Sequence, residues 1–146
     1  MVLSYQEVGN MDWKNCIGKL LSKKIQPDIN LIKSLIKSAE KKIEAEKSLP
    51  DSLSEPKISL IYDALRTLLE ALALSNGFKI YNHECYTAFL KEILKESSLG
   101  DNFDKYRKLR NAINYYGKEI SKKEAKEIIK DIIQMIKIIQ SKLRSA

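Results

Sequence analysis

The chain has 146 residues, of which 44% are hydrophobic and 31% charged. This composition is typical of a globular protein and not of a disordered chain. The length fits one domain with a sizeable core, so we expect residues 1–146 to form a single domain with residues 1–10 frayed. Only five glycines and three prolines are present. Because strand-rich sandwiches need frequent turn residues, this scarcity favours an all-α fold.

The net charge of +7 permits attraction to nucleic acid or to an anionic membrane. Most of the 26 basic residues are lysines, and lysines spread over helix surfaces more often promote solubility than form a binding patch. The few arginines are therefore more informative. Two of them, Arg107 and Arg110, lie three residues apart.

The two cysteines, Cys16 and Cys85, are far apart, and together with His83 they are too few for a structural zinc site. We therefore expect two separate core thiols and no metal or cofactor. No segment approaches the roughly 18 apolar residues of a membrane span. The N-terminal residues contain Glu7 and no long apolar core, unlike a secretory signal. A cytoplasmic location without membrane association is the expectation.

Hydrophobic periodicity predicts an antiparallel up-and-down bundle of about five main helices. The first is expected over residues 12–25, ending at Gln26 and Pro27. Asp28 is placed to cap the next helix, which gives way to a loop over residues 46–54. The core stripe of that second helix has a spacing of three or four residues and consists of Ile32, Ile36, Ala39 and Ile43.

The third helix is predicted to start near Pro56 and to be apolar on nearly every side, as expected of a central helix or one shared with a partner subunit. Asn76 and Gly77 should end it in a left-handed cap. A fourth helix is expected over residues 83–98, with a break at Leu99 and Gly100.

Residues 103–116 are predicted to form the next helix, with Asp101 and Asp104 as its cap and Gly117 at its end. The last helix should begin at a capping box formed by Ser121 and Glu124. Its expected core stripe consists of Ile128, Ile132, Ile136, Ile139 and Leu143.

Residues 106–116 separate into two faces at 100° per residue. The face to be buried contains Tyr106, Leu109, Ile113 and Tyr116. The adjacent polar arc contains Arg107, Arg110, Asn111 and Asn114. Such guanidiniums and carboxamides can hold a phosphate, and the flanking tyrosines can stack on bases. The alternative is an exposed stripe whose arginines pair with acidic residues of a neighbouring helix.

Three segments of the chain suggest a family. They are YDALRTLLEALALSNGFKIYNHECYTAFL at residues 62–90, KYRKLRNAINYYG at residues 105–117, and a basic, Ile-rich last helix. In their order and content they resemble the HEPN family (higher eukaryotes and prokaryotes nucleotide-binding domains), from Ile29 to the C-terminus.

Members of that family are α-helical bundles that usually dimerise. Many are metal-independent ribonucleases, often toxins whose antitoxin is a small nucleotidyltransferase. The resemblance implies a homodimer, RNA or a nucleotide as ligand, and a small nucleotidyltransferase as partner. The implied function is that of a degenerate or altered ribonuclease of a toxin–antitoxin type system. The alternative is a non-catalytic dimeric module that pairs with the nucleotidyltransferase.

The family signature is an Arg, commonly followed at once by a polar residue, and then a His with four to six residues between the Arg and the His. Arg110 and Asn111 match the first part, whereas Tyr115 occupies the first position open to the His. Arg110 can stabilise the charge of a phosphorane. Tyr115 is a poor base at neutral pH but can donate a proton. The resemblance thus implies Arg110 and Tyr115 as catalytic residues, with Arg107, Asn111, Asn114 and Tyr116 as binding residues.

An ideal helix places Arg110 and Tyr115 about 140° apart, so they can share a site only across a dimer or at the helix end. Other residues are expected to support the site. Asp63 and Glu70 lie on one face of the third helix and are expected to form a structural salt bridge with Arg107 or Arg110. Two further alternatives stay open. Tyr62 either lines the pocket or packs in the core, and His83 either caps a helix, which we favour, or acts as an acid or base.

Overall fold

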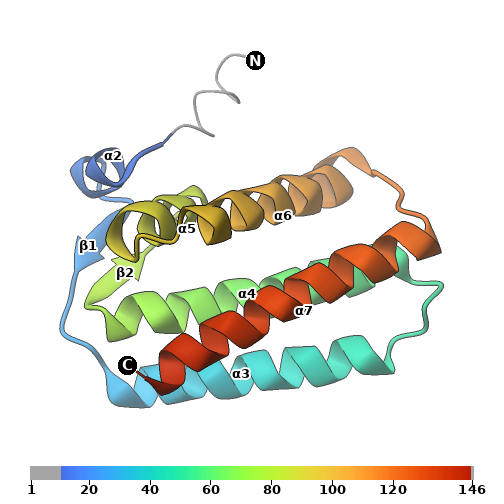
Figure 1. Ribbon diagram of the computed structural model, residues 1–146, viewed down its shortest axis with the longest axis horizontal. Coiled ribbons are helices and arrows are strands. Elements are labelled where there is room, and N and C mark those ends of the chain that lie inside the picture. The colour runs from blue at the N-terminus through green and yellow to red at the C-terminus, as the bar shows by residue number, and fades with distance from the viewer. Residues whose placement is uncertain (1–10, 146) are drawn as a thin grey trace.

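The computed structural model describes residues 11–145, so the fraying expected of residues 1–10 lies outside the described part. Within it the chain forms six α-helices and one two-stranded sheet, which confirms the all-α class. The four long helices run in alternating directions (Figure 1) and are α3 (Ile29–Ser48), α4 (Ser54–Ser75), α6 (Ser97–Tyr116) and α7 (Lys122–Arg144).

Helix α4 is the centre of the bundle. Its leucines, isoleucines and alanines are buried on nearly all sides, as the apolar pattern predicts. Helices α3 and α7 both pack along it. The predicted stripes of these two helices face it, since Ala39 of α3 and Ile132, Ile136 and Ile139 of α7 are buried. Because the chain's own helices cover α4, its apolar character does not require a partner subunit.

The predicted helix ends are largely confirmed. The Asp28 carboxylate accepts the Leu31 N–H at 3.1 Å, and the Ser121 hydroxyl accepts the Glu124 N–H at 3.2 Å. Gly77 and Gly117 adopt the left-handed conformation that ends α4 and α6, with φ of 86° and 65°.

The helix predicted over residues 12–25 is much shorter. Helix α2 covers only Trp13–Gly18 and is followed by Leu20, whose φ of 59° cannot continue a helix. Strand β1 (Ser22–Lys24) then pairs antiparallel with β2 (Phe78–Ile80). The last turns predicted for this helix are therefore replaced by strand β1, whose backbone hydrogen-bonds to the segment after α4.

The predicted helix over residues 83–98 and its break are also wrong. Helix α5 spans Glu84–Ala88, and a π-helical turn, η1 (Phe89–Ile93), follows it. Helix α6 starts at Ser97 and runs through Gly100, so neither Asp101 nor Asp104 caps it. A Cβ on Gly100 would lie 2.5 Å from the Lys91 side chain and 3.2 Å from the Thr87 carbonyl oxygen. This glycine serves close packing against α5 and η1 rather than a helix break.

Cys16 and Cys85 form a disulfide instead of two separate thiols. Pairing of β1 with β2 brings α2 against α5, which joins two cysteines 69 positions apart. Disulfides persist in oxidising compartments and in intracellular proteins of hyperthermophiles, so the cytoplasmic location stays a prediction. None of the helices within residues 11–145 has the length and apolar character needed to cross a membrane.

Candidate functional site

A polar face interrupts the apolar surface of α4 on the side between α3 and α6. Arg66 lies at its centre, 3.3 Å from Asp63 Oδ1 and 3.1 Å from Glu70 Oε1. Lys42 of α3 adds a 2.7 Å contact to Asp63 Oδ2. The structural salt bridge expected for Asp63 and Glu70 is therefore present, but its partner is Arg66 of the same helix instead of Arg107 or Arg110.

The carboxyl group of Asp63 illustrates how these charges balance. Burial raises its pKa, but the hydrogen bonds and positive charges of Lys42 and Arg66 outweigh burial and hold the pKa below its ordinary value. Asp63 is therefore ionised at neutral pH and neutralises the cations beside it. Arg66 is left with two carboxylate partners and no charge to spare for a ligand.

His83 and Tyr62 adjoin this face. The hydroxyl of the fully buried Tyr62 lies 3.1 Å from His83 Nδ1. His83 makes no side-chain capping bond at the start of α5. The Asn82 side chain instead accepts the Glu84 N–H at 2.8 Å, so the capping role predicted for His83 is wrong. The imidazole is free to take part in a site.

The protonation states follow from burial. Burial, reinforced by Arg66 and Arg110, lowers the pKa of His83 to about 4, and burial raises the pKa of Tyr62 above its ordinary value. A neutral imidazole therefore faces a protonated phenol at pH 7. Within residues 11–145 the Tyr62 hydroxyl has no hydrogen-bond partner besides His83 Nδ1. We assign the Tyr62 O–H as donor and Nδ1 as acceptor, which leaves the ring proton on Nε2 as a hydrogen-bond donor.

The arginines of α6 differ in how their charge is compensated. Arg107 is only 4% exposed, and its guanidinium donates to Asp104 Oδ1 at 2.8 and 3.2 Å. Arg110 is half-buried, with its guanidinium carbon 5.5 Å from the centre of the Tyr62 ring. Its one side-chain hydrogen bond goes to Asn111 Oδ1 at 3.5 Å. In the described part of the chain no carboxylate reaches ion-pair distance of Arg110.

Arg110 also borders a hollow of about 460 Å³ between the α3–α4 loop, α4 and α6. Asn114 lies beside it and forms a 3.2 Å hydrogen bond with Ser59 of α4. The remaining lining residues are Leu49, Pro56, Leu60 and Asp63. We use the name polar cluster for Tyr62, Asp63, Arg66, Glu70, His83 and Arg110, with this hollow at its edge.

The structure thus joins some of the predicted site residues and separates others. Arg110, Asn111, Asn114 and the supporting residues lie at or beside the polar cluster, whereas Arg107 is sequestered by Asp104. Tyr115 and Tyr116 are 71% and 77% exposed, so Tyr116 is not on a buried face, and neither lines the hollow. Sequence reasoning missed Arg66 and undervalued His83. Tyr62 and Arg66 lie one turn apart on an otherwise apolar helix, and this spacing could have indicated the polar face.

The polar cluster and the hollow at its edge supply hydrogen-bond donors and positive charge. In residues 11–145 no three His, Cys, Asp or Glu side chains lie together in a way that suits a metal ion. The Arg110 guanidinium lies over the Tyr62 ring, and the Tyr62 hydroxyl donates to His83 Nδ1. Of these three side chains only Arg110 borders the hollow, where its charge suits an oxyanion. Comparisons with family models, curated proteins and solved structures find no match.

Proposed function

We propose that the chain is a HEPN-like protein that binds the phosphate groups of RNA or of a nucleotide at the polar cluster. The observation that carries this proposal is the uncompensated charge of Arg110. That cation lies over the Tyr62 ring and beside a 460 Å³ hollow. A cation held in place by an aromatic ring and left without a carboxylate is well suited to a phosphate.

The same geometry argues for slow cleavage or none. Attack of a ribose 2′-hydroxyl on its phosphate requires a base, charge stabilisation and an acid for the leaving oxygen. Arg110 supplies charge stabilisation. His83 has a pKa of about 4 and does not line the hollow beside Arg110, so it is neither an effective base nor placed against a phosphate held there. We therefore expect binding to dominate over turnover.

Two matched substitutions test this proposal. Arg110→Ala removes the cation of the polar cluster, and Arg144→Ala removes the same charge from an exposed position at the end of α7. Loss of a charged hydrogen bond should weaken binding of a single-stranded RNA by about tenfold or more in Arg110→Ala. The slope of log affinity against log salt concentration should also decrease by about the amount expected for one phosphate contact. Equal effects of the two substitutions, with both proteins folded by circular dichroism, would contradict the proposal.

A cleavage assay distinguishes a ribonuclease from a binding protein. Wild type and Arg110→Ala are incubated with a mixed RNA pool in the presence of a chelator. Our expectation is slow or undetectable cleavage by the wild type. Fast cleavage that Arg110→Ala abolishes would show an enzyme and would overturn our expectation that binding dominates over turnover.

A second candidate, the dimeric module that pairs with a small nucleotidyltransferase, is favoured by Tyr115 and Tyr116. Two neighbouring aromatic side chains more than two-thirds exposed are typical of protein interfaces. Light scattering after size-exclusion chromatography tests this candidate. A dimer that becomes a monomer in Tyr115→Ser/Tyr116→Ser would support it, and a wild-type monomer would count against its dimeric form.

A further inference from the structure

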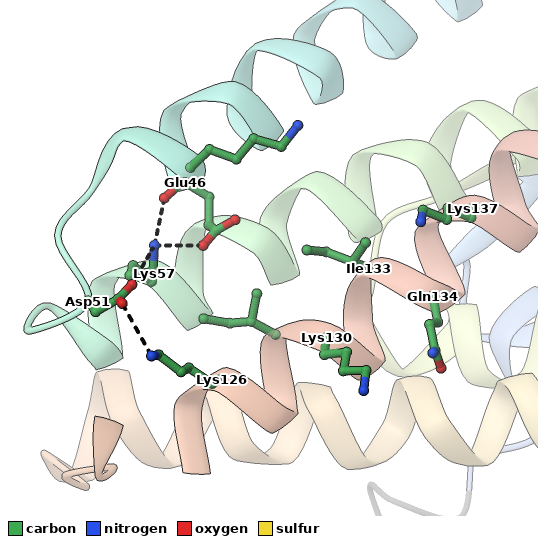
Figure 2. A pocket seen from close by; sticks show the side chains of 10 residues that line it. Glu46, Asp51, Lys57, Lys126, Lys130, Ile133, Gln134 and Lys137 are labelled. Atoms are coloured by element: carbon green, nitrogen blue, oxygen red, sulfur yellow. Dashed lines mark hydrogen bonds and ion pairs between the residues drawn. The ribbon is translucent and has the colours of Figure 1, made fainter. Parts of the chain in front are cut away.

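A second basic surface lies between α3 and α7, and Figure 2 shows it from close by. It contains a hollow of about 510 Å³. Lysines surround this hollow, and isoleucines form its apolar part. The residues on which the argument depends are Lys126, Ile129, Lys130, Ile133 and Lys137, all on α7. We call the hollow and its continuation along α7 the lysine groove.

A buried ion pair shapes one end of the lysine groove. Lys57 Nζ lies 2.9 Å from Glu46 Oε2, and it also donates to the carbonyl oxygens of Glu46 at 2.9 Å and Leu49 at 3.1 Å. Its three donors are therefore used. Asp51 of the α3–α4 loop reaches Lys126 at 3.5 Å (Figure 2). Lys57 thus fixes the wall of the groove and is not itself available to a ligand.

The remaining charge of the groove is positive. Five lysines line the hollow against two carboxylates, those of Glu46 and Asp51, which gives a formal charge of +3. Within residues 11–145 neither Lys130 nor Lys137 forms an ion pair. Ile133 is only half-buried between these two lysines. The surface therefore offers an apolar strip with cations along its edge.

This strip continues along α7. A second hollow of about 260 Å³ lies further along the same two helices and is lined by Ile36, Glu40, Gln140, Leu143 and Arg144. The lining positions of α7 recur every three or four residues, so they form one face. From Lys126 to Arg144 that face is roughly 27 Å long at 1.5 Å per residue. It matches a helix of about 18 residues.

We propose that the lysine groove binds an acidic amphipathic helix of a partner protein. Leucine-like side chains on such a helix would cover the half-buried Ile133 beside the largely buried Ile129, and its flanking carboxylates would face Lys126, Lys130 and Lys137. The described lining contains no aromatic side chain on which a base can stack, which disfavours single-stranded RNA. A second copy of this chain is disfavoured because its exposed helix faces are rich in lysine.

This inference is independent of the proposed function. Lys57 and Arg66 are nine residues apart on α4, which places them about 180° apart around the helix. The lysine groove and the polar cluster therefore lie on opposite faces of α4. The α7 lysines of the groove do not line the hollow beside Arg110, so their substitution leaves that hollow unchanged.

Fluorescence anisotropy with a designed probe tests the inference. The probe is a labelled 18-residue helical peptide with leucines at every third or fourth position and glutamates on both flanks. A peptide of the same composition in scrambled order is the control ligand. We expect the triple variant Lys126→Glu/Lys130→Glu/Lys137→Glu to bind the probe at least about tenfold more weakly than wild type, a difference of ~1.4 kcal/mol. The matched variant Lys33→Glu/Lys37→Glu/Lys41→Glu, on exposed positions of α3, should lose much less.

Three outcomes would overturn the inference. The wild type could bind the scrambled peptide as tightly as the probe, or the two triple variants could lose equal affinity. The third is a 12-nucleotide RNA that competes the probe from the wild type, which would make the groove a nucleic-acid surface. Ile133→Ser removes apolar contact without changing the charge. It should therefore also lower the affinity for the probe peptide and leave RNA binding unchanged.

Discussion

The polar cluster and the lysine groove are both basic, yet they handle positive charge in different ways. In the polar cluster, carboxylates compensate Arg66, and Arg110 alone keeps its charge on top of an aromatic ring. In the lysine groove the cations are exposed, and the Lys126 side chain is 64% exposed even while it faces Asp51. The two surfaces lie on opposite faces of α4.

Compensation and burial of the cations, rather than the number of charges, decide which anion each surface suits. A half-buried guanidinium with neighbouring donors matches a phosphate at a fixed position. Exposed lysines beside isoleucines match carboxylates spread along a helix.

The largest effect is expected at the base of the lysine groove. Lys57→Met leaves the Glu46 carboxylate buried without its partner, which should lower the free energy of unfolding by about 3–5 kcal/mol. Urea denaturation measures this loss, and Lys57→Met/Glu46→Leu should recover most of it. Lys47→Met, at an exposed pair 3.8 Å from Glu44, should cost less than about 1 kcal/mol. Similar losses at both lysines would be inconsistent with a buried pair.

Removal of the disulfide should act next to the polar cluster instead. Cys85 is two residues from His83 and tied to Cys16 of α2. Reduction, or Cys16→Ser/Cys85→Ser, should lower the free energy of unfolding by about 2–4 kcal/mol, because the open chain gains conformational freedom. Urea curves with and without reductant check this, and the double serine variant should not respond to reductant. RNA binding should weaken while binding of the acidic probe is unchanged.

Acidification should produce a smaller change that depends on His83. The folded-state pKa of about 4 lies below the ordinary value of 6.5, so the unfolded chain binds the proton first as pH falls. Stability is therefore fully retained above pH 6.5 and decreases between pH 6.5 and 4. The difference between wild type and His83→Gln in urea midpoints isolates this group from the carboxyl groups. A constant difference across that window would rule out the lowered pKa.

The smallest effect is expected at Tyr115, which the resemblance to HEPN proteins placed in the catalytic pair. Its side chain is 71% exposed and does not line the hollow beside Arg110. Tyr115→Phe removes only a solvated hydroxyl, so RNA affinity and any cleavage should stay within about twofold of wild type. A loss comparable to that of Arg110→Ala would restore Tyr115 to the site.

The long helices could be predicted because local signals agree with their packing. Apolar spacing, the caps at Asp28 and Ser121 and the glycines at 77 and 117 indicate the observed α3, α4 and α7 and the end of α6. Residues 12–25 and 83–100 could not be predicted in this way. Their structure depends on strand pairing, a disulfide and close packing at Gly100, which are contacts between segments remote in sequence.

The same distinction applies to the polar cluster. Arg110 stood out locally, because few arginines are present and Asn111 follows it. His83 is 21 positions from Tyr62, and only the turn after α4 brings the two rings together. The spacing of Arg107 and Arg110 suggested one stripe, but Asp104 withdraws Arg107 into a buried pair. Which charges are compensated depends on side-chain partners that residue spacing does not specify.

The proposed function requires that RNA phosphate be bound by the polar cluster and not by the lysine groove. Its most direct test measures RNA affinity at 0.15 M salt, where the screening length of about 8 Å suppresses distant charges. Arg110→Ala removes one charge, whereas Lys126→Ala/Lys130→Ala/Lys137→Ala removes three. We predict about a tenfold or greater loss for the single variant and less than about a threefold loss for the triple variant. The reverse order would contradict the account and assign RNA binding to the lysines.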